Sequence, residues 1–335
     1  EVGRTEAGIN SMRAAIEVLE QVPEAEVDRR DSTLVRWYYN LANTEVTWGD
    51  YATGAVHAEK AAFYNRNLSV SPTYYNCLLL RLQGYTSEHT GDFTTAYEYF
   101  QQAAECMANF SGDSQNYDAL LYWALRDLQA LTLGRMGQLE SCIDQLERVA
   151  AGYQALGLPP SKVNSNLAHN LHNQSWFNLQ LGNYARAKQA AQEVMDLYEE
   201  SYPNTYYPFI ANTIVLQGQV AQATGDFGTA LSYYDEALES LSPTYNPEAP
   251  LSDLQTTDNY LIYLELFDYR ARCLIALERE NEANEIYEWL ENIISRQRQT
   301  FRSGLSRFNI LSYARPAYEQ AILLNLYPNE GSANL

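Results

Sequence analysis

The sequence is short of basic residues, and above all of lysine. Lysine and arginine together number 22 against 42 aspartates and glutamates, so the 335-residue chain has a formal charge of −20, and only three of its basic residues are lysines. A surface of this sign repels the phosphates of nucleic acids and of anionic membranes. The charge therefore argues against both as partners and favours a protein or peptide partner with a basic surface.

Long hydrophobic runs and clustered cysteines are also missing. No charge-free apolar run reaches the ~18 residues of a membrane span, and the opening residues EVGRTEAGIN lack the basic start and apolar middle of a signal peptide. Cys77, Cys106, Cys142 and Cys273 lie far apart and form no C-x-x-C pair. The sequence therefore predicts four small buried thiols in a reducing cytoplasm.

Signatures of catalysis and of cofactor binding are absent from the sequence. It has no phosphate-binding loop, no G-x-S-x-G elbow and no H-E-x-x-H pair. Two of its four histidines, His169 and His172, are three residues apart on one face of an expected helix, which is how a metal site can begin. No acid or cysteine lies at helical spacing beside them. We therefore predict no metal, no cofactor and no catalytic residue.

The chain does contain one short motif in several copies, such as GDYATGAVHAEKA, GDFTTAYEYFQQA, GNYARAKQAAQEV and GDFGTALSYYDEA. The copies begin at Gly49, Gly91, Gly137, Gly182 and Gly225. Successive glycines are 42, 46, 45 and 43 residues apart, and a sixth copy, ALERENEANEIYEWL, has Glu278 at the glycine position. A helical segment precedes and follows each turn, so the sequence predicts a repeating helix–turn–helix unit.

The residues around each turn explain how such a unit would fold. Glycine ends the first helix by adopting the left-handed conformation, and the next residue, such as Asp92, caps the second helix. Small residues such as Gly84 and Gly218 let the two helices approach, and Phe100 fills the space to the next pair. A lone hairpin cannot bury its apolar face, so the pairs are expected to stack into a solenoid.

These residues resemble the tetratricopeptide repeat (TPR), whose signature places aromatic and small residues at fixed offsets. The stretches YYNLANTEVTWGDYATGAVHAEKA and LQGQVAQATGDFGTALSYYDEALESLSP match it best, although the repeat here exceeds the usual ~34 residues. The resemblance implies an all-α, right-handed superhelical solenoid with six hairpins and a partial N-terminal one. We expect that solenoid to cover residues 1–294, with a capping helix and a linker over residues 295–335.

The end of the chain carries a second resemblance. Residues 295–316, SRQRQTFRSGLSRFNILSYARP, contain five arginines and no acid, and YEQAI follows at 318–322. This junction is similar to that of bacterial TPR proteins that continue into a CHAT domain, a caspase-like cysteine protease module. The resemblance implies that the chain is the regulatory half, that the protease domain is missing from it, and that this domain is a candidate partner. The plainer interpretation is that the arginines neutralise the acidic helix before them.

The TPR resemblance also nominates binding residues, because the first helix of each unit lines the concave groove of that fold. The candidates for ligand or peptide binding are Arg36, Asn40, Asn43, Arg81, Tyr85, His169, His172, Asn173, Trp176, Asn212 and Gln219. Asn40 and Asn43 occupy positions at which peptide-binding relatives hold a peptide backbone or a terminal carboxylate. The lysines of that clamp are missing, which argues against a C-terminal carboxylate as the ligand. The plainer interpretation is a solvated polar groove.

Three functions are compatible with this sequence. The leading one is a non-catalytic, cytoplasmic scaffold that binds a protein or peptide. The first alternative is a solenoid that senses a small, sugar-like ligand in a bacterial signalling protein. The second is an α/α-barrel hydrolase, which would need two carboxylates facing a closed cavity.

Overall fold

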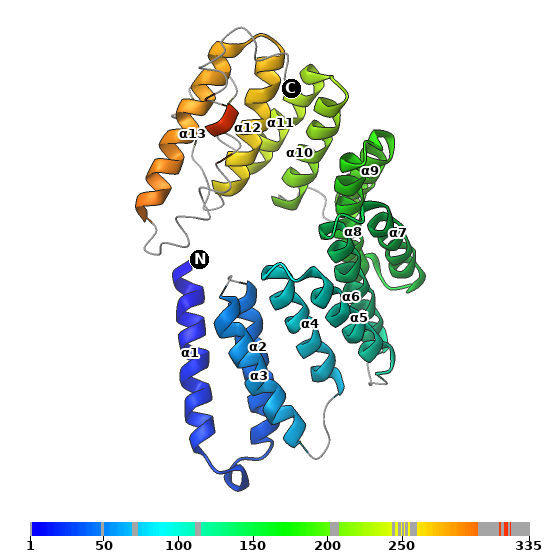
Figure 1. Cartoon of the computed structure of the whole chain (residues 1–335), viewed down its shortest axis with the longest axis vertical. Coiled ribbons are helices and arrows are strands. Elements are labelled where there is room, and N and C mark those ends of the chain that lie inside the picture. The colour runs from blue at the N-terminus through cyan, green and yellow to red at the C-terminus, as the bar shows by residue number, and fades with distance from the viewer. Residues whose placement is uncertain are drawn as a thin grey trace. The chain divides into compact units, whose positions relative to one another are not determined.

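In the computed structural model the chain forms helices joined by turns (Figure 1). The structure describes residues 2–47, 50–68, 73–110, 115–201, 208–242 and 260–300, together with residues 245, 246, 249, 251, 254, 315, 318–320 and 322. These residues contain helices and no strand, which confirms the predicted all-α fold. In the same part of the chain, no helix combines the length and hydropathy that a bilayer crossing requires.

The helices follow one another in pairs after the first. Their bounds are α1 (Val2–Gln21), α2 (Arg30–Thr47), α3 (Tyr51–Asn67), α4 (Thr73–His89), α5 (Phe93–Ala108), α6 (Gln115–Arg135), α7 (Leu139–Ala155), α8 (Pro160–Gln180), α9 (Tyr184–Ser201), α10 (Pro208–Ala223), α11 (Phe227–Leu241), α12 (Tyr260–Ala276) and α13 (Glu280–Thr300), with a short 3₁₀ helix, η1 (Glu24–Glu26), after α1. The pairs α2/α3, α4/α5, α6/α7, α10/α11 and α12/α13 are in contact, and Ser175 of α8 donates to the carbonyl of Ala187 in α9.

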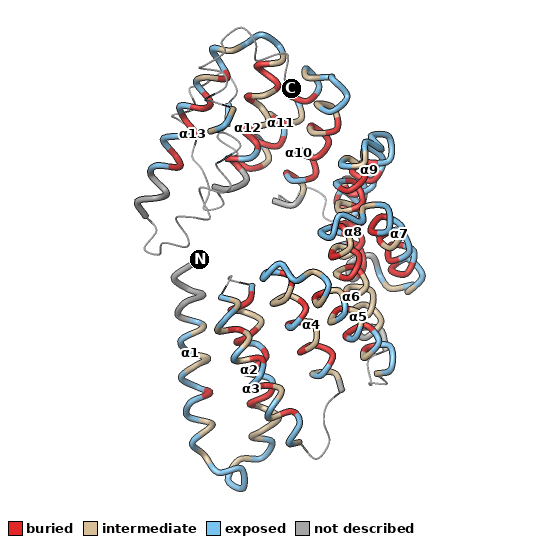
Figure 2. The backbone as a smooth tube through the Cα atoms, in the orientation of Figure 1, coloured by how far each residue is buried: buried red, intermediate tan, exposed pale blue. Residues whose placement is uncertain are grey.

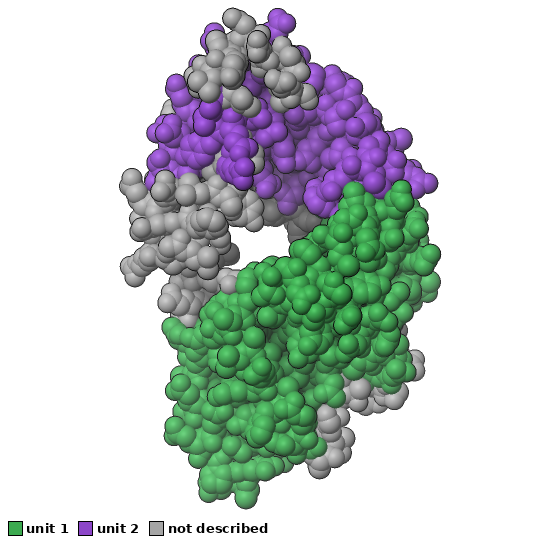
Figure 3. Space-filling model, viewed as in Figure 1, with its two compact units in different colours: residues 1–173 green, residues 174–335 purple. Residues whose placement is uncertain are grey.

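The chain divides into two compact units, residues 1–173 and residues 174–335, which Figure 3 colours green and purple. The boundary falls within α8. The expected division at residue 294 stays a prediction, and α13 continues past it to Thr300. Most of the arginine-bearing segment that follows lies outside the described residues.

The turns have the chemistry that the sequence predicts. Gly91 has a φ of 83°, a left-handed conformation that a residue with a side chain rarely adopts. Asp92 then caps α5, because its carboxylate accepts a hydrogen bond of 3.1 Å from the backbone N–H of Thr95. At the sixth turn, Glu278 itself adopts a φ of 60°. The sixth copy of the motif therefore keeps the turn although it has lost the glycine.

Small residues allow the helices of a pair to approach closely, as predicted. A Cβ atom on Gly84 would lie 2.5 Å from the ring of Phe100, and one on Gly218 would collide with the ring of Tyr234. Ala96 and Ala230 are fully buried in the same pairs. The aromatic ring of the second helix therefore occupies the space that the glycine of the first helix leaves empty.

Each unit has a core along the facing sides of its helices, where the buried residues recur in Figure 2. In unit 1 the largest described cluster joins α1, α2, α3 and α4 and includes Leu34, Tyr38 and Leu82. In unit 2 the cluster joins α10 to α13 and includes Tyr234, Tyr263 and Phe267. In these two clusters the facing apolar side chains of the helices are buried by their neighbours in the stack, as stacking of repeats requires.

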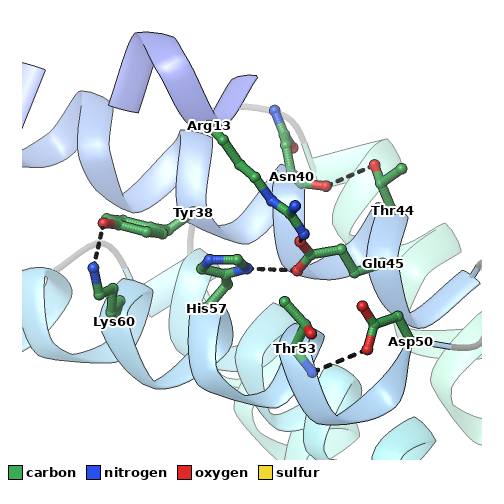
Figure 4. Close-up of polar contacts among 9 residues, drawn as sticks. All are labelled: Arg13, Tyr38, Asn40, Thr44, Glu45, Asp50, Thr53, His57 and Lys60. Atoms are coloured by element: carbon green, nitrogen blue, oxygen red, sulfur yellow. Dashed lines mark hydrogen bonds and ion pairs between the residues drawn. The ribbon is translucent and has the colours of Figure 1, made fainter. Parts of the chain in front are cut away.

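Polar contacts fasten α1 to the first helix pair (Figure 4). Glu45 of α2 is only 1% exposed, and it accepts a hydrogen bond of 2.6 Å from Arg13 of α1. On its other side, Nδ1 of His57 in α3 lies 2.5 Å from the second carboxylate oxygen. Because a buried carboxylate is costly unless it is paired, this arrangement ties three helices together.

The structure corrects the prediction of four free thiols. Cys77 of α4 and Cys106 of α5 form a disulfide, with their Cα atoms 5.4 Å apart, whereas Cys142 and Cys273 are free and buried as expected. The two bonded cysteines are 29 residues apart in sequence. The prediction was wrong because the antiparallel course of α4 and α5 brings them together, and spacing along the chain does not show this.

Candidate functional site

The predicted groove residues of unit 1 centre on Arg81 of α4. Its Nη2 donates to the hydroxyl of Tyr39, at 2.5 Å, and to Oδ1 of Asn43, at 3.5 Å, and both of these residues belong to α2. The Nε atom of Arg81 is buried and has no hydrogen-bond partner among the described residues. The guanidinium is therefore held against α2 through Nη2, while its Nε is enclosed by the protein.

Two tyrosines on either side of Arg81 remain neutral. Burial raises the pKa of Tyr39, although the nearby guanidinium of Arg81 acts in the opposite direction. Burial likewise raises the pKa of Tyr85, which packs edge-on against Phe100 with ring centres 5.5 Å apart. Since neither phenol ionises near neutral pH, they supply apolar surface and hydroxyl groups and leave the charge of Arg81 uncancelled.

A second polar contact joins α4 to α6. Glu88 of α4 pairs with Arg135 at 2.6 Å and accepts a hydrogen bond of 3.3 Å from the hydroxyl of Thr132. Burial raises the pKa of this carboxyl, and the charge of Arg135 partly offsets the effect. An ionised group in this position depends on its partners, so Glu88 fixes α6 against α4.

A third contact joins α6 to α8. Asn170 of α8 donates a hydrogen bond of 2.8 Å from Nδ2 to the carboxyl of Asp127 in α6. Burial raises the pKa of Asp127 to about 7, and the bond from Asn170 only partly opposes this. Asp127 is therefore poised between its neutral and ionised forms at neutral pH.

The three contacts form a ladder at the period of the repeat. The pairs Tyr39–Arg81, Glu88–Thr132 and Asp127–Asn170 are separated by 42, 44 and 43 residues. Each pair joins the first helix of one repeat to the first helix of the next. Arg81, which sequence reasoning assigned to a ligand, therefore also helps to hold two successive repeats in register.

Not every expected groove residue takes part in this ladder. Arg36 and Asn40 of α2 are exposed. Burial raises the pKa of Tyr75, and the nearby charge of Arg36 partly opposes this rise. The backbone carbonyl of Asn40 accepts from Thr44, and its side-chain amide points away from Glu45 in Figure 4. These two side chains are free to contact a partner without loss of a described internal bond.

The histidines of α8 do not assemble a metal site. Nδ1 of His169 lies 2.6 Å from the carbonyl oxygen of Ser165, one turn earlier. Burial, with a contribution from His169, lowers the pKa of His172 to about 4. Among the described residues, no group of three or more metal-binding side chains occurs. His172 and the half-buried Asn173 are therefore neutral polar groups near the end of unit 1.

Unit 2 holds the remaining candidates. Trp176 of α8 is 44% exposed and packs edge-on against Phe177, with ring centres 4.8 Å apart. Asn212 of α10 is exposed, while Gln219, two turns later on the same helix, hydrogen-bonds Tyr269 of α12. Gln219 thus serves the same inter-repeat role as Arg81, and Trp176 presents an unusually large apolar surface to solvent.

Sequence reasoning missed several members of the ladder, among them Tyr39, Glu88, Asp127, Thr132 and Asn170. A signal for them was present. Tyr39 and Arg81 are 42 residues apart, which equals the spacing of the glycines that end their repeats. Polar side chains separated by one repeat on successive first helices are therefore candidates for direct contact.

Comparison with known proteins gives the family of one segment. Residues 167–242 match the sequence profile of the tetratricopeptide repeat. They run from α8 to the end of α11 and include the turns at Gly182 and Gly225. No curated protein matches the chain in sequence.

Solved structures of similar fold extend over more of the chain. BtubC (BKLC) from P. vanneervenii has a TM-score of 0.57 at 17% identity, covering 76% of this chain and 98% of its own. NprR, solved in complex with its cognate peptide NprX, has a TM-score of 0.55 at 13% identity, covering 98% of this chain and 85% of its own.

A third structure is a signal transduction ATPase with numerous domains (STAND) and a tetratricopeptide repeat sensor, from Pyrococcus horikoshii. Its TM-score is 0.60 at 11% identity, and the match covers 98% of this chain and 49% of that protein. Identities this low show a shared fold and nothing about activity. The chain is therefore built of helical hairpins of the tetratricopeptide-repeat fold, with a tetratricopeptide-repeat sequence at residues 167–242.

Proposed function

We propose that this chain is a non-catalytic scaffold that binds a protein or peptide through the first helices of its repeats. The observation that carries the proposal is that Arg36 and Asn40 are exposed on α2, the helix whose Tyr39 and Asn43 anchor the guanidinium of Arg81. An anchored arginine loses little conformational freedom when it binds, so its remaining donors suit an acceptor on a ligand.

The surroundings of Arg81 support an extended peptide as the ligand. Arg36 and Asn40 are exposed on α2, and the neutral ring of Tyr85 lies beside Arg81 on α4. Together they offer hydrogen-bond donors for backbone carbonyls and an apolar ring for a side chain. NprR, a protein of similar fold, was solved in complex with its cognate peptide.

The charge of the whole chain favours a partner with a basic surface. At −20 the chain attracts cations over several ångströms, which speeds encounter, whereas short-range hydrogen bonds and buried rings set the lifetime of the complex. The proposed partner is therefore basic overall and presents carbonyl acceptors in the segment that Arg81 contacts.

A displayed library of random peptides tests this proposal with no assumption about the natural partner. Peptides enriched on the wild-type chain should lose at least tenfold in affinity on an Arg36→Ala/Asn40→Ala variant. They should bind normally to Asp144→Ala, which removes an exposed charge from α7. Enrichment of peptides that bind all three proteins equally would refute the assignment of the site.

A small-ligand sensor is the second candidate, and the exposed indole of Trp176 favours it. Aromatic faces stack on sugar rings, and the STAND protein of similar fold carries a tetratricopeptide repeat sensor. Quenching of tryptophan fluorescence by a panel of mono- and disaccharides, compared with Trp176→Phe, separates this candidate from peptide binding.

The narrower proposal, a regulatory half for a caspase-like protease, rests on the arginine-bearing segment at 295–316 and the YEQAI motif that follows it. Glu319 of this motif pairs with Arg315, four residues earlier, at 2.6 Å. The open reading frame past Leu335 tests this proposal, because the proposal requires a following module that contains the His and Cys blocks of the protease. A cytoplasmic location belongs to the same proposal, and it would require the Cys77–Cys106 pair to be reduced in the cell.

A further inference from the structure

The outer face of α3 carries two large apolar side chains that solvent reaches. Val56 is 54% exposed and Phe63 is 53% exposed. They lie seven residues apart, with Glu59 and Lys60 between them at helical spacing, so all four share one face of the helix. An exposed apolar stripe of this kind marks a contact surface when it is not a general feature of the fold.

The stripe is specific to α3. The residues that match Val56 and Phe63 in the second helices of the other five repeats, counted from the turn glycine or its replacement, are also exposed. They are Glu98 and Glu105 in α5, Asp144 and Ala151 in α7, Gln189 and Asp196 in α9, Ser232 and Glu239 in α11, and Glu285 and Asn292 in α13. Nine of these ten residues are polar, so packing of the repeat does not require large apolar groups at these positions.

A groove lies beside the stripe. It has a volume of about 950 Å³ and is lined by α3, α4 and α5, with Val56, Phe63, Leu79 and Leu80 among its apolar walls. The matching groove of unit 2, between α9, α10 and α11, measures about 290 Å³. In that groove Lys188 occupies the position that corresponds to Ala55 in α3.

We propose that a second copy of this chain covers the stripe, with the two α3 helices packed antiparallel about a two-fold axis between Glu59 and Lys60. In an antiparallel pair centred there, Val56 of each copy faces Phe63 of the other. The same symmetry places Glu59 of each copy against Lys60 of the other. A self-complementary patch is what a two-fold interface requires, and the four residues provide it.

Solvent still reaches Lys60, although it has partners within its own chain. Lys60 bonds the hydroxyl of Tyr38 at 2.9 Å and lies 3.6 Å from Glu20, yet its side chain is still 48% exposed. Repulsion between two chains of −20 is screened beyond ~8 Å at physiological salt, so charges far from α3 contribute little. The face is also distinct from Arg81, so dimerisation and peptide binding are separable.

Light scattering coupled to size exclusion tests the proposal on the whole chain. The mass should rise from 38.1 kDa toward twice that value over roughly 1–200 μM, as for a small interface. Val56→Glu/Phe63→Glu should stay monomeric with an unchanged circular dichroism spectrum. Val18→Glu is the matched control, because Val18 is 66% exposed on α1 and lies outside the groove, so this variant should still dimerise.

Cross-linking tests the position of the axis. Glu59→Cys lies next to the proposed axis and should form an intermolecular disulfide on mild oxidation, whereas Arg66→Cys, two turns away, should not. The native free thiols, Cys142 and Cys273, are buried and should not interfere. Two results would overturn the proposal: a wild-type chain that stays monomeric, or a dimer that persists in Val56→Glu/Phe63→Glu. The first result would leave the groove to a helix of another protein.

Discussion

Asp127 of α6 accepts a hydrogen bond of 2.8 Å from Asn170 of α8, in a position where the aspartate is only 9% exposed. The contact joins two repeats, and one of its partners can titrate. Burial has raised the pKa of Asp127 to about 7. The polar ladder that holds successive first helices together therefore contains a step that responds to pH near neutrality.

The stability of the chain should fall as this carboxyl ionises. In the unfolded chain Asp127 titrates near its ordinary value of 3.8, so between about pH 4 and 7 the folded state binds more protons than the unfolded state. The contribution of Asp127 to the free energy of unfolding is therefore greatest below its pKa in the unfolded chain. It is lost as the pH rises through its pKa in the folded chain. Three pKa units correspond to ~4 kcal/mol in the free energy of unfolding.

Asp127→Asn isolates this effect, because the amide keeps an acceptor for Asn170 and cannot ionise. We expect the variant to unfold at a higher temperature than the wild type at pH 8 and to lose that advantage at pH 4.5. Asp144→Asn, a substitution at an exposed position of α7, is the control, and its melting temperature should not gain on the wild type at pH 8. Parallel melting temperatures of Asp127→Asn and wild type across this range would contradict the prediction.

Gly84→Ala should destabilise unit 1, because the added Cβ would lie 2.5 Å from the ring of Phe100. The ring is fully buried and cannot move aside, so the expected cost is ~1–3 kcal/mol. Gly8→Ala is the opposite case, since nothing lies within 4 Å of its Cβ position in α1, and it should stabilise the helix by ~0.5–1 kcal/mol. Urea unfolding of both variants checks that the free energy of unfolding falls in Gly84→Ala and rises in Gly8→Ala.

Loss of the Cys77–Cys106 bond should lower the melting temperature. The bond closes a loop of 29 residues, for which the chain-entropy account gives about 3.5 kcal/mol. Protein purified without reductant should show two free thiols after denaturation, and reductant should lower its melting temperature but not that of Cys77→Ala/Cys106→Ala. Four titratable thiols in the denatured protein would instead support the reducing cytoplasm that the sequence suggests.

Arg81→Met should weaken the contact between α2 and α4. Methionine keeps much of the apolar stem but removes the donors to Tyr39 and Asn43, so the expected loss is ~1–3 kcal/mol. Arg36→Ala and Asn40→Ala, both exposed, should each change stability by less than ~0.5 kcal/mol. Equal stability losses at all three positions would mean that the ladder does not depend on Arg81.

Local chemistry made the helices and turns predictable from the sequence. Gly91 and Asp92 act within four residues of themselves, through a left-handed φ and a capping bond to Thr95. Even the loss of glycine at Glu278 left the turn in place, because the flanking helices still pack as a pair. The all-α fold therefore follows from preferences that short stretches of the sequence display.

The internal contacts of the candidate binding residues could be predicted only in part. The repeat register placed Asn43 and Arg81 on neighbouring first helices, where they do meet. It did not show that Arg81 is held by Tyr39, or that Asp127 and Asn170 form a buried pair, because such contacts depend on helix rotation and on the distance between axes.

By itself, the sequence determined the period of the chain, the ends of its helices and the acidic charge of its surface, since each follows from residues a few positions apart or from a sum over all of them. Tertiary structure alone decided that Cys77 meets Cys106 and that Val56 and Phe63 stand exposed beside a groove. Those outcomes depend on which faces two helices turn toward each other. A change of a few ångströms in helix packing reverses such a result without altering a single local preference.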